Sequence, residues 1–287
     1  MSQVNKKTIN IRGRLLDLSG PVVMGILNIT PDSFFAQSRV QSAEEIVDKA
    51  GEMLQEGALI LDIGGYSTRP GAREIEPAEE SERVAAALEV LTRHFPEALF
   101  SADTFRAMVA RQAVYSGAHM INDVAGGNLD PDMFDTVADL QVPYVLMHMR
   151  GTPATMNKLT HYDQLIPDIL KDLQQKVDIL RQKGVTDLII DPGFGFAKTI
   201  AQNFELLAGL SEFKRLGYPV LAGLSRKTTI YKTLNTTAEH ALNGTTVLNT
   251  LALERGASIL RVHDVKPAVE AVKLWTATTR YLNKIVI

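Results

Sequence analysis

The sequence of 287 residues predicts one domain, residues 1–287, with the (β/α)₈ architecture of the TIM barrel. Three observations predict it: eight short apolar runs recur along the chain, longer amphipathic stretches separate them, and no low-complexity linker interrupts the alternation. Runs that are apolar throughout are typical of strands buried on both faces, as in a parallel sheet. A doubly wound open sheet would give a similar pattern and is the alternative.

The predicted barrel strands are the eight short apolar runs. In chain order they are Val22–Leu27, Ala58–Ile63, Ala98–Ala102, His119–Ile121, Pro143–Met147, Asp187–Ile190, Pro219–Leu224 and Ser258–Val262. Before them, Thr8–Leu18 is predicted to form a short β-hairpin, with Ile9–Ile11 and Leu15–Asp17 as its strands. We expect this hairpin to close the bottom of the barrel.

The stretches between the strands predict helices. Ser42 and Glu45 have the spacing of a capping box and predict a helix start, and Pro77 with Glu79 and Glu80 suits another first turn. The further predicted helices are Phe105–Ser116, Pro131–Leu140, Tyr162–Lys183, Asn203–Leu216, Ala238–Arg255 and Val265–Lys284. A glycine is predicted to end a helix in the left-handed conformation at positions 57, 117, 184, 217 and 256.

Composition excludes several classes of protein. Lys and Arg total 30 against 33 Asp and Glu, so no general basic field attracts nucleic acid or an anionic membrane. The chain has 0 Cys, which excludes thiol nucleophiles, thiolate zinc sites and disulfides. The first residues lack the apolar segment of a secretory signal, and no stretch reaches the ~18 apolar residues of a membrane span. We therefore expect a cytoplasmic location.

Every predicted strand ends in a polar residue. These are Asn28, Asp62, Asp103, Asn122 with Asp123, His148, Asp191, Ser225 with Lys227, and Arg261 with His263. Active sites of this architecture lie at the C-terminal strand ends, and buried polar groups are costly unless something pairs with them. A bound ligand explains all of them, and the alternative is that they satisfy one another.

The polar strand ends form two chemical sets. Carboxylates and amides suit a neutral heterocycle that presents adjacent N–H donors, whereas Arg69, Lys227, Arg261 and His263 suit a phosphate or pyrophosphate. The glycine pairs at positions 64–65 and 126–127 leave room for backbone to approach a ligand. We interpret Lys198 as a solvated or ion-paired lysine and His148 as a histidine bonded to backbone.

Seven segments at these strand ends, in this order, resemble dihydropteroate synthases, the pterin-binding barrel enzymes of folate synthesis. The resemblance covers essentially the whole chain and is carried by Met24–Phe34, Ser67–Gly71, Ile121–Asp123, Met147–Pro153, Asp191–Phe196, Ser225–Lys227 and Arg261–Val265. It implies that 6-hydroxymethyl-7,8-dihydropterin pyrophosphate condenses with 4-aminobenzoate to give 7,8-dihydropteroate and pyrophosphate. It also implies a homodimer, for which Leu274 and Trp275 are candidate contacts.

The resemblance assigns roles to matching positions. Asp103, Asn122, Asp191 and Lys227 are expected to bind the pterin, and Asn28, Thr68, Arg69, Arg261 and His263 the pyrophosphate, with Asn28 on a Mg²⁺ ion. Phe34, Thr68, Pro70 and Ser225 are expected to shape the aminobenzoate pocket. The expected reaction is a displacement at the pterin methylene in which charged groups hold the leaving pyrophosphate and no strong base is needed. The catalytic set is Asp103, Asp191, Lys227, Arg261 and His263.

Three positions depart from the pattern of these enzymes. Tyr66 stands where glutamate is usual, Phe35 lies in an atypical first loop, and Arg106 replaces a frequent lysine. These departures bear on loop closure, aminobenzoate affinity and sulfonamide sensitivity. Two other functions stay open: a pterin-binding methyltransferase that serves a corrinoid protein, and a catalytically silent pterin-binding homologue. The first has no use for a pyrophosphate site, and the second is expected to lose charged strand-end residues.

Overall fold

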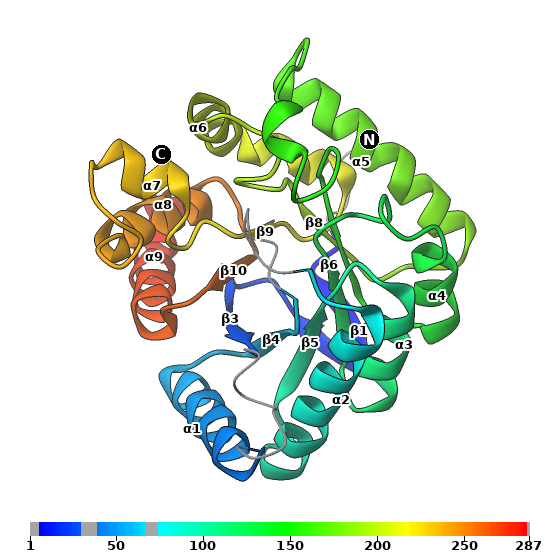
Figure 1. Ribbon diagram of the computed structural model, residues 1–287. Helices are drawn as coiled ribbons and strands as arrows, with labels where there is room; N and C mark the ends of the chain where they lie inside the picture. The colour runs from blue at the N-terminus through cyan, green and yellow to red at the C-terminus, as the bar shows by residue number, and fades with distance from the viewer. Residues whose placement is uncertain (1–5, 30–38, 67–73, 286–287) are drawn as a thin grey trace.

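The computed structural model describes residues 6–29, 39–66 and 74–285, and it confirms the (β/α)₈ barrel (Figure 1). The parallel strands lie in the order β8-β7-β6-β5-β4-β3-β10-β9, and a parallel bridge between Ile190 and Val220 joins the two ends of this sheet. The strands are β3 (Val22–Asn28), β4 (Ile60–Gly64), β5 (Leu99–Asp103), β6 (Met120–Asp123), β7 (Tyr144–Met147), β8 (Leu188–Asp191), β9 (Leu221–Ala222) and β10 (Ile259–Val262). Each overlaps a predicted strand, and the open-sheet alternative is excluded because the ring closes.

The predicted hairpin is present and closes one end of the barrel. Strands β1 (Thr8–Ile11) and β2 (Arg14–Asp17) pair antiparallel. Ile9 and Ile11 are buried in one cluster with apolar residues from seven barrel strands, at or near the strand starts. These residues are Met24, Ile60, Met120, Val145, Ile189, Leu221 and Ile259. The hairpin therefore seals the end of the barrel opposite to the polar strand ends.

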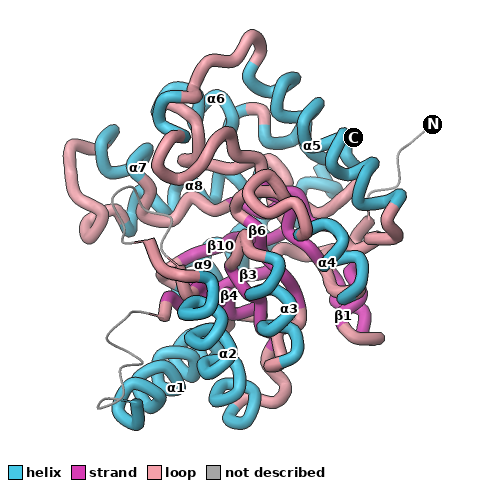
Figure 2. Tube along the Cα trace, turned by 45° about the vertical axis from the view of Figure 1, so that its right-hand side comes forward, coloured by secondary structure: helices cyan, strands magenta, loops and turns pink. Residues whose placement is uncertain are grey.

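Helices surround the strands, as Figure 1 shows along the barrel and Figure 2 from a view turned by 45°. They are α1 (Arg39–Glu56), α2 (Pro77–His94), α3 (Ala107–Tyr115), α4 (Met133–Leu140), α5 (Leu165–Gln182), α6 (Ile200–Ala208), α7 (Thr228–Thr233), α8 (Leu242–Glu254) and α9 (Val265–Ile285), with the 3₁₀ segments η2 (Met156–Lys158) and η3 (Leu210–Leu216). The largest of three apolar clusters lies between the strands and this helical layer. None of the helices in the described ranges could cross a membrane.

Several helix predictions are wrong in their limits by two to four residues, and three of them show why. Helix α1 begins at Arg39, so Ser42 is not its N-cap; no Gly or Pro stops the helix from extending backwards. The predicted helix over Asn203–Leu216 is split at Gly209, where a Cβ would lie 2.0 Å from Ile166 Cδ1 of α5. Helix α8 begins at Leu242 rather than at Ala238, because the side chain of Arg226 donates to the carbonyls of Ala238 and Glu239.

The helix-ending glycines are confirmed. Gly57, Gly117, Gly184, Gly217 and Gly256 all have positive φ, between 82° and 113°. Each lies directly before a barrel strand or within a few residues of one. A side chain at such a φ is strained, so glycine ends the helix there and lets the chain turn back into the barrel.

Candidate functional site

The polar residues at the C-terminal end of the barrel, which we call the mouth, point into the barrel because of their positions in the strands. Side chains alternate between the two faces of a strand, so a residue two positions after an inward-facing one also faces inward. Asp62, Asn122, Asp191 and Arg261 each follow by two positions an apolar residue of the cluster that the hairpin seals. The same alternation that fills the bottom of the barrel thus gathers these polar groups above it.

Arg261 lies among the carboxylates of the mouth. Its Nε donates to Asp62 Oδ2 at 2.6 Å, and its Nη2 donates to Asp103 Oδ2 at 2.5 Å. Asn122 Nδ2 donates to the same oxygen of Asp62 at 2.8 Å. The expected separation of a basic set from an acidic set therefore does not hold for Arg261, which two carboxylates neutralise.

Asp62 is the buried centre of this arrangement. Its side chain has no exposed surface, and its Oδ1 has no hydrogen-bond partner within the described part of the chain. The sequence placed Asp62 among the carboxylates suited to a neutral heterocycle, but the resemblance assigned it no specific role. Its position two residues after Ile60 could have indicated that it shares the interior with Asn122 and Arg261.

Asn28, Asp103 and Asn122 occupy one level of the mouth. The strand register aligns Asn28 with Gly64, Gly64 with Asp103, and Asp103 with Asn122. Because Gly64 has no side chain, the two flanking residues share the space above it: a Cβ there would lie 3.5 Å from Asn28 Oδ1 and 3.6 Å from Asp103 Oδ2. The amide oxygen of Asn28 and the Asp103 oxygen that accepts from Arg261 thus lie on either side of Gly64.

Asp191 and Lys227 lie on the opposite side of the barrel, around the turn that follows β8. Asp191 Oδ1 accepts from the backbone of Gly193 at 2.8 Å. Lys227 Nζ donates to the carbonyl of Phe194 and lies 4.8 Å from the centre of the Phe196 ring. Lys227 is therefore held by backbone and an aromatic face of this turn, close enough to Asp191 for the two charges to interact.

His263 and Ser225 form a separate pair. Ser225 Oγ accepts from the backbone N–H of His263 at 3.2 Å and lies 3.0 Å from its Nδ1. Ser225 is buried, whereas His263 is partly exposed at the end of β10. The structure therefore brings together a residue expected at the aminobenzoate and one expected at the pyrophosphate.

Burial is the largest single influence on the pKa of Asp103, Asp191, Lys227 and Arg261. It raises the pKa of Asp103 to about 7, a shift that Arg261 opposes and Asp62 reinforces. It raises the pKa of Asp191, which Lys227 opposes, and it lowers the pKa of Lys227 to about 8, which Asp191 opposes. For Arg261 burial is outweighed by Asp62 and Asp103, which raise its pKa. Arg261 stays charged, whereas Asp103 and Asp191 depend on neighbouring cations to stay ionised.

Two features that the sequence placed near the ligand have structural partners instead. Asp123, next to Asn122, accepts from Tyr144 Oη at 2.6 Å and from two backbone N–H groups at 2.7 Å. A Cβ on Gly126 would lie 2.1 Å from the Met147 carbonyl oxygen, and one on Gly127 would lie 2.3 Å from the Phe134 ring. The glycine pair at 126–127 is therefore explained by packing.

Lys198 is not the solvated or ion-paired residue that the sequence suggested. It is buried under the turn after β8, and its Nζ lies 2.9 Å from Gly193 O, 3.0 Å from Phe196 O and 3.1 Å from His148 Nδ1. No carboxylate pairs with it directly within the described residues. Asn203 lies on the other side of the turn, with its Oδ1 2.6 Å from the Gly195 nitrogen.

Two of the unusual positions contact each other. The guanidinium of Arg106 lies 5.2 Å from the centre of the Tyr66 ring, and it donates to Glu80 Oε2 at 2.8 Å and to the Ile75 carbonyl at 2.9 Å. Glu80 is fully buried and also accepts from Thr104 Oγ1 at 2.7 Å. Tyr66 and Arg106 thus form a local unit with a buried carboxylate beside the end of β5.

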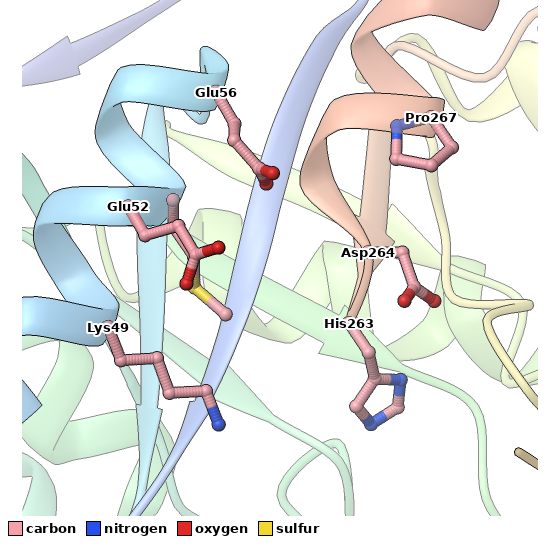
Figure 3. A pocket seen from close by; sticks show the side chains of 7 residues that line it. Lys49, Glu52, Glu56, His263, Asp264 and Pro267 are labelled. Atoms are coloured by element: carbon pink, nitrogen blue, oxygen red, sulfur yellow. The ribbon is translucent and has the colours of Figure 1, made fainter. Parts of the chain in front are cut away.

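A cavity of about 220 Å³ lies between α1 and the start of α9 (Figure 3). Figure 3 shows Glu52 and Glu56 reaching from α1 toward Asp264, with His263 just before α9. Glu56 accepts from the backbone of Lys266 at 3.2 Å, and Asp264 is paired with Arg226 at 2.7 Å. Two of its acidic groups therefore have structural partners, and the cavity adjoins the mouth at His263.

Four expected site residues, Phe34, Thr68, Arg69 and Pro70, lie outside the described residues, as does Phe35. Within the described ranges no group of three or more His, Asp or Glu side chains could hold a metal ion. This finding leaves open a Mg²⁺ ion bound by one or two protein oxygens, since Mg²⁺ usually keeps several of its waters.

Comparison with known proteins identifies the group to which this chain is similar. The family model described as "Pterin binding enzyme" matches residues 24–263. The dihydropteroate synthase of Haemophilus influenzae is 40% identical over 267 residues, which are 92% of this chain and 96% of that protein.

Two solved structures share the fold and much of the sequence. The dihydropteroate synthase of Xanthomonas albilineans with 4-aminobenzoic acid is 42% identical, with a TM-score of 0.86 over 95% of this chain and 98% of that chain. The same enzyme in complex with 7,8-dihydropteroate is 39% identical, with a TM-score of 0.83 over the same shares of the two chains.

Proposed function

The chain belongs to the dihydropteroate synthases of the pterin-binding enzyme family, and from this premise we propose how its own residues divide the work. Its reaction joins 6-hydroxymethyl-7,8-dihydropterin pyrophosphate to 4-aminobenzoate, with release of pyrophosphate, in folate biosynthesis. The observation that carries the assignment of roles is the convergence of Asp62, Asp103, Asn122 and Arg261 in one hydrogen-bonded group at the C-terminal end of the barrel.

The pterin ring is bound by the acidic and amide groups of the mouth. A carboxylate can accept two parallel bonds from the N–H edge of an aminopyrimidinone. Asp62 and Asp103 are bonded to Arg261, whereas Asp191 is not, so Asp191 is the carboxylate best placed to accept them. Asn122 is held by Asp62, so its amide is oriented before the ligand arrives. Lys227 supplies a donor beside Asp191 and keeps that carboxylate ionised.

The reaction is a displacement at the methylene carbon of the pterin. The C–O bond to pyrophosphate breaks, the amine nitrogen of 4-aminobenzoate forms the new C–N bond, and the amine then loses a proton to solvent. An arylamine is neutral near pH 7, so it attacks without a general base. The protein contributes by stabilising separated charge, since fixed dipoles and charges in a dry site are most effective there. Asp103 and Asp191 stabilise the cationic methylene.

The leaving pyrophosphate is held by cations at the mouth. Arg261 is the best-placed described cation, because binding of the pyrophosphate can draw its guanidinium from Asp62 and Asp103 toward a more highly charged partner. His263 contributes from the end of β10, and its contact with Ser225 fixes its ring. Thr68 and Arg69 remain predicted members of this anion site.

A Mg²⁺ ion is proposed at Asn28. Mg²⁺ prefers oxygen ligands, and the amide oxygen of Asn28 and a carboxylate oxygen of Asp103 both lie close to Gly64, which has no side chain between them. When bound, the ion would neutralise charge on the pyrophosphate. Removal of divalent cations with EDTA is expected to abolish turnover, and added Mg²⁺ is expected to restore it; turnover that persists in EDTA would reject this cofactor.

The aminobenzoate lies near Ser225. The predicted pocket combines Ser225 with Phe34, Thr68 and Pro70, and the Ser225–His263 contact links it to the anion site. This arrangement would place the amine next to the methylene as pyrophosphate leaves.

The chain is proposed to act in the cytoplasm as a homodimer of one-domain subunits. Helix α8 is apolar on two faces: Leu248 and Leu253 are buried, while Val247 and Leu251 are exposed. Leu274 of the neighbouring α9 is also exposed, at 71% of its surface. Exposed apolar side chains that gather on two neighbouring helices mark an interaction surface, so a second subunit is proposed to cover α8 and α9. Trp275 donates to Glu254 at 2.9 Å and packs partly on the core, so Leu274 is the better candidate contact.

The direct test of these roles is product formation by the purified protein and by variants of its proposed pterin-binding residues. Mass spectrometry is expected to detect 7,8-dihydropteroate when both substrates and Mg²⁺ are present. Asp191→Asn is expected to raise KM for the pterin substrate at least ~10-fold and to leave KM for 4-aminobenzoate nearly unchanged, since one charged hydrogen-bonding group is lost. An equal rise in both KM values would reject Asp191 as a ring-binding residue.

A further inference from the structure

Lys198 is a buried charge that the proposed reaction does not use. Only 8% of its surface is exposed. A lysine ammonium has three donors, and three acceptors surround this one: the carbonyls of Gly193 and Phe196 and the Nδ1 of His148. When Lys198 is protonated its ammonium cannot accept, so His148 Nδ1 is then the acceptor and the imidazole is neutral with its proton on Nε2. Burial, which lowers the pKa of His148 to about 2, agrees with that state.

The turn of residues 193–196, which Lys198 contacts, packs tightly against the end of β7. Gly193 and Gly195 both have positive φ, at 76° and 80°. A Cβ on Gly193 would lie 2.0 Å from the carbonyl oxygen of His148, so the turn rests directly on the end of β7. The ammonium ties the first and last carbonyls of this four-residue turn to that same histidine.

The same turn positions Lys227. The carbonyl of Phe194 accepts from Lys227 Nζ, and the ring of Phe196 lies 4.8 Å from that atom. The nitrogen of Gly193 donates to Asp191. A displacement of the turn would therefore move Lys227 and Asp191 relative to each other.

We propose that Lys198 is a positioning residue for the pterin site: it fixes residues 193–196 against β7 and thereby sets the geometry of Lys227 and Asp191. The inference rests on the proposed function, because Lys227 and Asp191 are its ring-binding groups. Lys198 does not touch the substrate in this role, since it is covered by the turn. Loss of Lys198 should therefore weaken binding of the pterin substrate and leave binding of 4-aminobenzoate unchanged.

The test is Lys198→Met, which keeps the length of the side chain and removes all its donors. We expect KM for the pterin pyrophosphate to rise about tenfold or more, as for the loss of charge-assisted hydrogen bonds, with KM for 4-aminobenzoate changed less than about twofold. The matched control is Lys176→Met, because Lys176 also has 8% of its surface exposed but lies in α5, paired with Asp172 at 2.9 Å. The control is expected to lower Tm and leave both KM values unchanged.

If Lys198→Met does not fold, Lys198→Gln keeps two of the donors and is expected to give a smaller rise in the same KM. Unchanged KM values in a folded variant, or an equal rise for both substrates, would overturn the proposal. So would a failure of both variants to fold, because Lys198 would then be needed for the barrel as a whole. Failure of the proposed function is distinguishable, since the wild-type protein itself would then form no dihydropteroate.

Discussion

Arg261 and Asp103, 158 residues apart in the chain, form an ion pair of 2.5 Å at the mouth of the barrel. The pair joins the last strand of the barrel to a strand from its first half. It places the cation that would hold the pyrophosphate in contact with a carboxylate that would face the pterin. The proposed pyrophosphate site and the proposed pterin site thus share an ion pair before any ligand binds.

Loss of Arg261 is predicted to disable the reaction without unfolding the barrel. Arg261→Ala is expected to lower kcat about 10²–10³-fold, as for the loss of a single charge-stabilising donor in other active sites. Steady-state kinetics and thermal unfolding should be measured together. The control is Arg215→Ala, since the Arg215 side chain is 75% exposed on η3. Normal turnover in Arg261→Ala would remove this residue from the mechanism.

The charge of Asp62 is predicted to control the pH dependence. Asp62 raises the pKa of Asp103, so Asp62→Asn should lower that pKa from its value of about 7. In the proposed mechanism Asp103 acts as a carboxylate, so the acid limb of the kcat/KM profile for the pterin substrate is expected to move to lower pH in the variant. The rate at the optimum should fall as well, because Arg261 and Asn122 lose their shared acceptor. An acid limb that stays in place or moves to higher pH would contradict the account.

Lys198 is predicted to make the ligand-free protein more stable as pH rises above neutrality. Burial lowers the pKa of Lys198 to about 7, with Asp191 and Asp172 opposing the shift and Lys227 and Arg150 adding to it. Between pH 7 and about 10 the unfolded chain binds more protons at this lysine than the folded chain, so the free energy of unfolding increases with pH there. Lys198→Met lacks this linkage. The Tm of the wild type relative to the variant should therefore rise from pH 7 to about pH 9, and a constant difference would argue against a depressed pKa.

Gly193 is predicted to tolerate no side chain. Gly193→Ala combines a positive φ of 76° with a Cβ only 2.0 Å from the His148 carbonyl oxygen. Gly184→Ala is the matched control, because Gly184 has a φ of 84° and no atom within 4 Å of its Cβ position. The control should lose about 1–2 kcal/mol of unfolding free energy, and Gly193→Ala should lose clearly more. Equal losses in denaturant unfolding would show that the close approach to His148 can relax.

The proposed dimer is predicted to be held together by the exposed apolar face of α8 and α9. Val247→Lys with Leu274→Lys should convert the dimer to a monomer in size-exclusion chromatography with light scattering, because two charges would be buried in an apolar contact. Met108→Lys is the control, since Met108 and Val247 are each 50% exposed but Met108 lies on α3. A dimer that survives the double substitution would place the interface elsewhere.

The strands and their polar ends could be predicted from the sequence because two simple signals coincide. Fully apolar runs mark strands buried on both faces, and the residue at each C-terminal end must face the mouth of a barrel. The helix limits were harder: the capping box at Ser42 was wrong because nothing stops α1 from extending back to Arg39. Helix α7 was missed because six residues of mostly polar sequence carry no helical periodicity.

The contacts inside the site could be predicted only in part. Alternation along the strands accounts for Asp62, Asn122, Asp191 and Arg261 pointing inward. It does not say that Arg261 binds carboxylates from β4 and β5, since that depends on the closure of the ring and on side-chain length. The burial of Lys198 depends on the course of a turn with three positive φ values, at Gly193, Gly195 and Ala197, which local sequence does not reveal.

The most direct test of the central claim is the rate of pyrophosphate release from pterin pyrophosphate by the purified protein in the presence of Mg²⁺, with and without 4-aminobenzoate. The account predicts release that depends on 4-aminobenzoate and matches the dihydropteroate formed. Binding of the pterin substrate without 4-aminobenzoate-dependent release would contradict it and would favour a methyltransferase or a silent pterin-binding protein.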